Sequence, residues 1–275
     1  MLRPFTQVDV FPAAPYQGNA LAVVLDGEGL STEEMQRFAR WTNLAETTFL
    51  LPPTTPEADY RVRIFTTVAE LPFAGHPTLG SCHAWLEAGG KPAKDGEVVQ
   101  ECGAGLVRVR ATENGLAFQA PPLVRSGPVE EELVERIAAS LGIGPGDVVA
   151  AEWADNGAGW VGLLLADAES VLALRPGAVP HYVGVVGPYP EGSQSAFEVR
   201  AFLPRPESHL EDPVTGSLNA SLAQWLLRTG RARAPYTVTQ GSMIGHAGRI
   251  RIDGSAEEVW VGGAVVTSVT GRVEL

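Results

Sequence analysis

The chain has 275 residues, which exceeds the usual size of one hydrophobic core and suits two domains of about 130–140 residues each. Its net charge of −12 and the lack of a basic tract exclude nucleic acids and anionic membranes as partners. Two cysteines cannot build a disulfide framework, the N-terminus lacks the apolar core of a signal peptide, and no apolar run could cross a bilayer, so we expect a reduced, cytoplasmic protein.

The first half of the chain alternates short apolar strands with two helices. Apolar residues that alternate or run together between turn residues predict strands over 8–11, 20–25, 47–51 and 60–65. Ser31 with Glu34 three residues later forms a capping-box pattern, which predicts a helix that continues to about Thr42. A second helix is predicted over 77–88, and a hairpin over 98–110 follows it.

The second half repeats this order after a helical stretch over 130–141, which is expected to open it. The elements predicted there are strands over 160–165 and 197–202, a helix over 213–228, a hairpin over 236–252 and a strand-like segment over 259–270. Because strands outnumber the helices that could connect them, a doubly wound parallel sheet is disfavoured. The pattern predicts an α+β fold with two similar halves.

The helix over 217–227 is apolar over most of its circumference, and such a helix is normally surrounded by protein. Each half is therefore expected to be a strand-rich barrel around one central helix. The boundaries place the N-terminal half at 1–122, which the strand over 264–275 could complete, and the C-terminal half at 123–263.

Two stretches, 73–86 and 210–222, share a Pro-x-x-Gly-Ser pattern that begins at Pro77 and at Pro213. Their constant offset is 213 − 77 = 136 residues, and each stretch leads from an extended segment into an apolar helix. A helix start carries free N–H groups and the positive end of the dipole, so it attracts a carboxylate or a phosphate. The repeat predicts a pseudo-symmetric anion-binding site between two similar halves.

Three polar side chains stand near these helix starts or at the edge of a buried strand. His76 and Asp212 precede the two repeated patterns, where a histidine and a carboxylate could handle protons. Glu46 lies where an apolar strand begins, a place where burial suits a general acid or base. Structural roles stay open for all three: local backbone contacts for His76, a helix N-cap for Asp212 and a solvated loop position for Glu46.

Other chemistries have weak support in the sequence. The five histidines lack the paired spacing of a zinc site, so no metal site is expected. No G-x-S-x-G elbow indicates a serine hydrolase, and no glycine-rich nucleotide motif lies between a strand and a helix.

The segments that carry these residues resemble the PhzF-type phenazine-biosynthesis isomerase family over essentially the whole chain. The resembling segments are Asp9-Val-Phe, Gln17-Gly-Asn-Ala-Leu-Ala-Val-Val, Asn43-Leu-Ala-Glu-Thr-Thr-Phe, Glu70-Leu-Pro-Phe-Ala-Gly-His-Pro-Thr-Leu-Gly, Glu211-Asp-Pro-Val-Thr-Gly-Ser and Gln240-Gly. The resemblance implies a diaminopimelate epimerase-like fold, with the active site between the two halves. It also implies a cytoplasmic homodimer that uses no cofactor and no metal.

The resemblance implies a role for each site residue. Glu46 corresponds to the family's catalytic glutamate, which removes a proton from one carbon and returns it to another, and His76 and Asp212 correspond to its polar partners. The residues implied to bind a small carboxylated substrate are Asn19, Gly75, Thr215, Gly216 and Ser217. The family's best-known reaction isomerises trans-2,3-dihydro-3-hydroxyanthranilate.

Two alternatives remain at this stage. An amino-acid epimerase or racemase on the same fold would need a thiol at each helix start, but Cys82 lies inside a predicted helix and Cys102 in a hairpin. One carboxylate that moves a proton on one face gives isomerisation rather than inversion. The second alternative is a non-enzymatic small-molecule-binding protein, against which the joint presence of Glu46, His76 and Asp212 argues.

Overall fold

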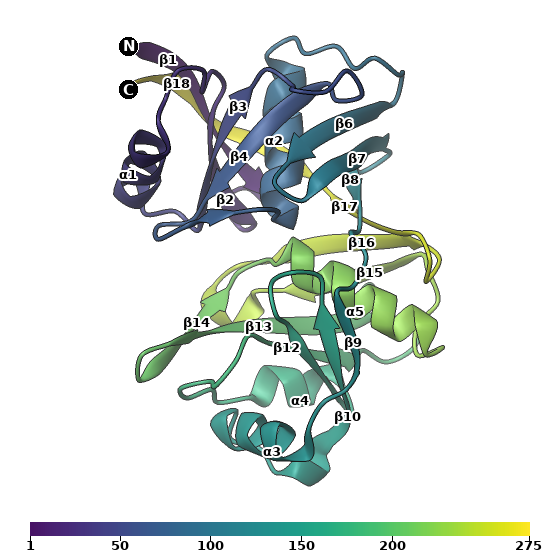
Figure 1. Cartoon of the computed structure of the whole chain (residues 1–275). Coiled ribbons are helices and arrows are strands. Elements are labelled where there is room, and N and C mark those ends of the chain that lie inside the picture. The colour runs from purple at the N-terminus through teal and green to yellow at the C-terminus, as the bar shows by residue number, and fades with distance from the viewer. The chain divides into compact units, whose positions relative to one another are not determined.

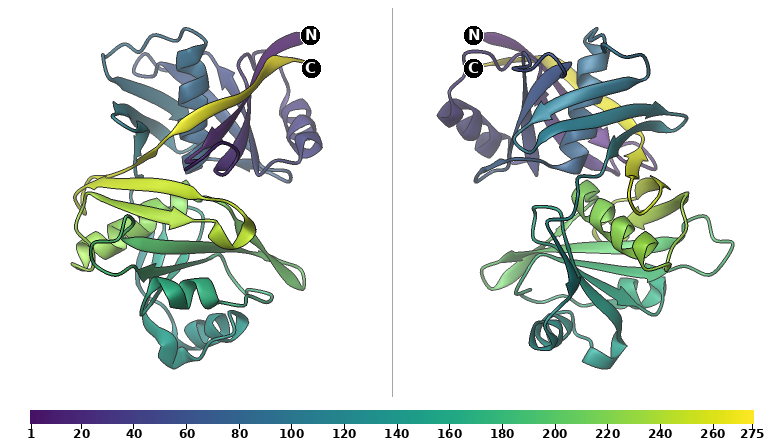
Figure 2. Two further views of the ribbon diagram at one scale, coloured as in Figure 1. Left: turned by 180° about the vertical axis from the view of Figure 1, so that it is seen from behind. Right: turned by 45° about the vertical axis from the view of Figure 1, so that its right-hand side comes forward.

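The computed structural model describes residues 1–275, which form two compact units. Unit 1 contains Met1–Gln119 and Gly262–Leu275, and unit 2 contains Ala120–Val261. The boundaries expected from the sequence lie within a few residues of these. Both ends of the chain belong to unit 1, where the first and last strands run side by side (Figure 2). None of the helices is both long and apolar enough to span a lipid bilayer.

Unit 1 is built from ten strands and two helices (Figure 1). Its strands are β1 (Leu2–Val10), β2 (Asn19–Val24), β3 (Glu46–Leu51), β4 (Tyr60–Phe65), β5 (Glu70–Leu71), β6 (Glu97–Cys102), β7 (Gly105–Thr112), β8 (Gly115–Gln119), the end of β17 (Val259–Gly263) and β18 (Val265–Glu274). Its helices are α1 (Thr32–Thr42) and α2 (Gly75–Glu87). Neighbouring strands are antiparallel except β2 with β3 and β4 with β6, and a helix connects each of these parallel pairs.

Unit 2 has the same plan after an added strand and helix. Its strands are β9 (Arg125–Pro128), β10 (Val148–Asp155), β11 (Val161–Leu165), β12 (Val183–Pro188), β13 (Phe197–Arg205), β14 (Ser208–Asp212), β15 (Tyr236–Gln240), β16 (Gly248–Gly254) and most of β17. Its helices are α3 (Glu131–Ser140), α4 (Ala168–Ala173) and α5 (Gly216–Arg228), with short 3₁₀ turns at Pro145–Asp147 and Ser242–Ile244. The parallel pairs are again connected by helices: β11 with β12 through α4, and β13 with β15 through α5.

The repetition of β-β-α-β-β-β-α-β-β in the two units confirms the predicted α+β fold with two similar halves. The helix α4 matches α1 in this order and was not predicted from the sequence. It is only six residues long, too short to show a helical period.

The helix α1 begins as predicted because its start is determined locally. The backbone N–H of Glu34 donates to the Ser31 hydroxyl at 3.2 Å, and the Ser31 N–H donates to the Glu34 carboxylate at 2.8 Å. Its residues Met35, Phe38 and Ala39 share one face and pack into a core with strand residues of unit 1. The capping box therefore sets the start of the helix and the apolar face sets its orientation.

The central helices α2 and α5 are buried over most of their length, as predicted. α2 packs against β1, β2, β3 and β8, and α5 packs against β10, β12 and β16 (Figure 1). Glycine allows the close approach in unit 1, because a Cβ on Gly80 would lie 2.6 Å from Leu21 Cδ2. In unit 2 a Cβ on Gly184 would lie 2.2 Å from Leu218 Cδ1.

The predicted alignment of the two helix starts is wrong by five residues. α2 begins at Gly75 and α5 at Gly216, so the structural offset is 216 − 75 = 141 rather than 136. Pro77 is the third residue of α2, whereas Pro213 precedes α5. Proline fits both the first helical turn and an extended segment, so this shared residue could not define the register.

A second consequence concerns Asp212, which lies at the end of β14 and is not the N-cap of α5. Asp212 pairs with Ala201, and in unit 1 Leu71 pairs with the matching residue Ile64. The structural counterpart of Asp212 is therefore Leu71, and that of His76 is Ser217, the second residue of the other central helix. The expectation that His76 and Asp212 occupy matched positions is wrong.

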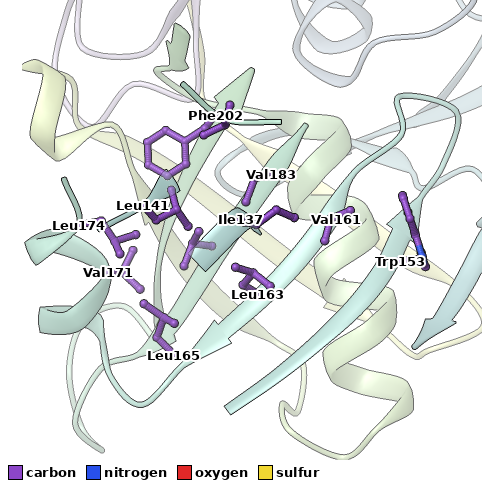
Figure 3. Close-up of a cluster of buried hydrophobic side chains, with 12 residues drawn as sticks. Ile137, Leu141, Trp153, Val161, Leu163, Leu165, Val171, Leu174, Val183 and Phe202 are labelled. Carbon is purple, nitrogen blue, oxygen red and sulfur yellow. The ribbon is translucent and has the colours of Figure 1, made fainter. Parts of the chain in front are cut away.

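The core of unit 2 lies between α3, α4 and the strands that they cover. Figure 3 shows Leu141, Val171 and Leu174 grouped with Leu163 and Phe202 of the strands. These side chains are at most 2% exposed, and their burial anchors the helix that leads from β11 to β12.

A buried ion pair fixes β14 to β13, and its counterpart in unit 1 is more exposed. Arg200 donates to both carboxylate oxygens of Glu211 at 2.9 and 2.8 Å, and also to the carbonyls of Val171 and Leu174. The two charged side chains are 4% and 6% exposed. The matching pair of Arg63 with Glu70 is 22% and 38% exposed.

We predict that Glu211→Gln lowers the free energy of unfolding by about 3–5 kcal/mol, because it leaves the Arg200 charge buried without its carboxylate. The matched control Glu70→Gln should cost about 1 kcal/mol or less, because water screens and replaces the partner there. Urea unfolding followed by circular dichroism measures both values. Equal losses in the two variants would contradict this assignment.

Candidate active site

In unit 1, different elements bring three polar side chains together. Glu46 is the first residue of β3, whose parallel register pairs it with Leu21 of β2. His76 is the second residue of α2, and its Nε2 atom lies 3.2 Å from Oε2 of Glu46. Asn19 begins β2, and its Nδ2 atom lies 3.4 Å from Nδ1 of His76. The structure thus groups Asn19, Glu46 and His76.

The imidazole of His76 is neutral, and its neighbours define which nitrogen carries the proton. Burial lowers the pKa of His76 from 6.5 to about 3, because the charged form would lose its hydration. The amide N–H of Asn19 faces Nδ1, which therefore accepts, and the proton is carried by Nε2. Nε2 lies 3.2 Å from Oε2 of Glu46, although the N–H group and the carboxylate are not aligned as a hydrogen bond. The contact brings a neutral imidazole close to a carboxylate and is not an ion pair.

We predict that this buried neutral histidine makes the protein acid-sensitive. Its folded-state pKa lies below the unfolded value of 6.5, so its contribution to stability is complete above pH 6.5 and declines as the pH falls toward 3. Within that window the slope should be about 1.4 kcal/mol per pH unit. Urea titrations at several pH values should show a shallower slope for His76→Asn than for wild type. Equal slopes in wild type and His76→Asn would contradict the neutral buried state.

Unit 2 contains a polar network around the start of α5. The Thr215 hydroxyl lies 2.5 Å from Oδ2 of Asp212, and Thr215 is the N-cap residue. Gln240, at the end of β15, contacts Asp212, Thr215 and Asn219 through its amide. Thr215, Asn219 and Gln240 are 6%, 2% and 0% exposed. Asp212 and Thr215 therefore belong to one network, which fixes the start of the helix.

The first turns of both central helices lack the side-chain cap that α1 has. Neither N-cap residue, Ala74 before α2 nor Thr215 before α5, accepts a hydrogen bond from its helix through its side chain. The N–H groups at Gly75 and Gly216 can thus serve an anion. In α5, Asn156 Nδ2 donates to the Ser217 carbonyl at 2.8 Å, and Trp160 Nε1 donates to the Ser217 hydroxyl at 3.2 Å.

Gln240, Asn219, Asn156 and Trp160 were not predicted as site residues. Gln240 lies within the resembling Gln-Gly pair, but its role depends on the register of β15 beside β13, which spacing along the chain does not give. Asn156 and Trp160 lie at a turn and its end, where polar and aromatic residues are common. These residues are therefore recognised from the three-dimensional fold and not from a pattern along the chain.

The two cysteines lie away from the helix starts. Cys82 is the eighth residue of α2, and burial raises its pKa to about 12. Cys102 ends β6, where burial also raises the pKa of its thiol. A thiolate at neutral pH is thus disfavoured at both positions. Groups of three or more His, Cys, Asp or Glu side chains that could hold a metal ion are absent.

Comparisons with known proteins cover nearly the whole chain. The model of the phenazine biosynthesis-like protein family matches residues 8–271. The chain is 33% identical over 268 residues to trans-2,3-dihydro-3-hydroxyanthranilate isomerase of Pseudomonas aeruginosa, covering 94% of this chain and 93% of that protein. It is also 33% identical over 291 residues to antisense-enhancing sequence 1 of Schizosaccharomyces pombe, covering 98% of this chain and 97% of that protein.

A solved structure shows the same fold. The PhzF-family protein of Bacillus anthracis superimposes with a TM-score of 0.80 at 22% identity, covering 100% of each chain. The chain therefore belongs to the phenazine biosynthesis-like protein family and is an enzyme of the isomerase class.

Proposed function

We propose that the protein isomerises a small cyclic carboxylated substrate similar to trans-2,3-dihydro-3-hydroxyanthranilate, with Glu46 as the group that carries the proton. The observation that supports this best is the contact between Glu46 and a neutral His76 in unit 1, at 3.2 Å. The relative from Pseudomonas aeruginosa named for that substrate lends support to the substrate class.

In the proposed mechanism, the Glu46 carboxylate removes a proton from one substrate carbon and becomes a carboxylic acid. It then returns the same proton to a second carbon on the same face, so the carboxylate is regenerated and no proton is consumed. His76, whose Nε2 lies 3.2 Å from Oε2 of Glu46, is proposed to turn its N–H group toward the carboxylate and to orient it before the transfer, while Asn19 holds the imidazole in the required tautomer.

The substrate carboxylate is proposed to bind the N–H groups at the start of a central helix, either around Gly75 of unit 1 or around Gly216 and Ser217 of unit 2. Pre-placed donors of this kind stabilise developing negative charge because they need no reorganisation during the reaction. Asp212 and Thr215 are proposed to bind a substrate amine or hydroxyl, for which a carboxylate is a suitable acceptor.

The test is turnover of trans-2,3-dihydro-3-hydroxyanthranilate, followed by ultraviolet absorbance and chromatography. The proposal expects a product with a rearranged double bond, formed at a rate proportional to enzyme. A panel of free amino acids should stay unchanged in chirality. Inversion of an amino acid without isomerisation would instead support an epimerase, and inertness toward the whole panel of cyclic amino and hydroxy acids would support a non-enzymatic binding protein.

The epimerase alternative has no specific support in the described site. Two opposed bases are needed to invert a centre, and the two thiols that could serve are buried away from the helix starts. The proposal therefore retains a single proton carrier.

A further inference from the structure

Gln240 has all four hydrogen-bonding positions of its amide occupied within unit 2. Its Oε1 accepts from the Thr215 N–H at 3.1 Å and from Asn219 Nδ2 at 2.8 Å. Its Nε2 donates to the carbonyl of Asp212 at 3.0 Å and to the hydroxyl of Thr215 at 2.8 Å. A buried amide with every position satisfied is rigid, and each partner constrains the others.

The backbone determines which way round this amide lies. The Thr215 N–H can only donate and the Asp212 carbonyl can only accept, so a flipped Gln240 amide would face a donor with a donor and an acceptor with an acceptor. The orientation with Oε1 at the Thr215 N–H is therefore fixed. Since Nε2 then donates to the Thr215 hydroxyl oxygen, the hydroxyl proton is directed to another acceptor.

That acceptor is the Asp212 carboxylate, whose Oδ2 lies 2.5 Å from the Thr215 hydroxyl. A short hydrogen bond of this kind favours the ionised form of the acceptor. We propose that Gln240 is a positioning residue that sets the direction of the Thr215–Asp212 hydrogen bond and so holds Asp212 as an ionised acceptor. Its effect on turnover rests on the proposed function, whereas the direction of the hydrogen bond does not.

Unit 1 contains a similar glutamine without the carboxylate. Gln100 of β6 is also fully buried and donates to the hydroxyl of Thr78, the fourth residue of α2. That hydroxyl donates to the Ala74 carbonyl rather than to an acid. Gln100 also accepts from the hydroxyl of Tyr60 at 2.9 Å, so it is a buried glutamine that supports a helix start without an acid, and it serves as a control for burial and packing.

Three other charged or titratable groups lie near this network. Glu211 next to Asp212 is bound by Arg200. Glu198 of β13 accepts from Tyr189 and Thr239. His246 packs beside Gly241, which follows Gln240. Within the network, the Thr215 hydroxyl donates to the Asp212 carboxylate.

The experiment is a carboxyl ¹³C NMR titration of the full-length protein, with the Asp212 signal assigned by its loss in Asp212→Asn. Thr215→Val should raise the measured pKa of Asp212 by about one unit, and Thr215→Ser should leave it near the wild-type value. Gln240→Met should raise it by about half a unit. In Thr215→Val, adding Gln240→Met should produce no further shift, because Gln240 acts through the hydroxyl.

The control Gln100→Met should lower the unfolding midpoint as Gln240→Met does while leaving the pKa of Asp212 unchanged. The proposal is overturned if Thr215→Val leaves that pKa unchanged, or if Gln240→Met shifts it equally with and without the Thr215 hydroxyl. If the protein turns over trans-2,3-dihydro-3-hydroxyanthranilate, the acid limb of the pH profile of kcat/KM should move in each variant by the same amount as the pKa of Asp212 measured by NMR. Absent turnover would count against the proposed function only, because the titration reads Asp212 directly.

Discussion

Replacing Glu46 by Gln is expected to lower kcat for isomerisation of trans-2,3-dihydro-3-hydroxyanthranilate by about 10³-fold, within the range for loss of a general acid–base group. The amide of Gln keeps the size of the side chain but cannot accept a proton from carbon. A Gln side chain can keep the contact with His76 at the start of β3, so the variant should fold normally. Steady-state kinetics with matched circular dichroism spectra measure both expectations.

Glu33→Gln provides the matched control, since Glu33 is an exposed carboxylate on α1. Its kcat should equal that of wild type. A folded Glu46→Gln protein with full turnover would remove Glu46 from the mechanism, and equal losses in Glu46→Gln and Glu33→Gln would indicate a general effect of charge.

His76→Phe is expected to lower kcat by about 10²-fold, because it removes the N–H group that we propose orients the Glu46 carboxylate. His76→Gln should lose only about tenfold, because its terminal amide can donate from nearly the same position as Nε2. Both substitutions also abolish the acid titration of the buried imidazole. The comparison therefore separates the hydrogen bond from the ionisation of His76.

The order of the two variants decides the role of His76. A greater loss in His76→Gln than in His76→Phe would mean that the ring fills space, not that it donates. A higher KM with an unchanged kcat in both variants would assign His76 to substrate binding. Rates for these variants should be measured above pH 7, where the predicted acid sensitivity of the fold has no influence.

The sequence could predict those parts of the fold that are determined locally. The helix α1 is one example, because Ser31 and Glu34 satisfy its first N–H groups within four residues of chain. The starts of α2 and α5 are the opposite case. Pro77 and Pro213 look alike locally, yet one lies inside a helix and the other before one. The packing of each helix within its barrel determines where the helix begins. The alignment based on the two prolines is therefore wrong by five residues.

The candidate site could be predicted only in part from the sequence, for the same reason. Glu46 and His76 are 30 residues apart in sequence (76 − 46 = 30), and only the parallel pairing of β2 with β3 together with the burial of α2 brings them together with Asn19. The resemblance of the local motifs identified these residues without explaining their proximity. Gln240 lay within a resembling Gln-Gly pair but received no role, because a buried glutamine on a strand has no distinctive pattern along the chain.

The central claim is that a single carboxylate moves one proton between two carbons on one face of the substrate. The most direct measurement is turnover of trans-2,3-dihydro-3-hydroxyanthranilate that carries deuterium at the carbon to be deprotonated, in ordinary water, with the product analysed by NMR and mass spectrometry. We predict that part of the deuterium appears at the second carbon of the product, and that Glu46→Gln forms no such product. Inversion at the labelled carbon, with complete exchange of its deuterium for solvent hydrogen and no isomerisation, would contradict the account.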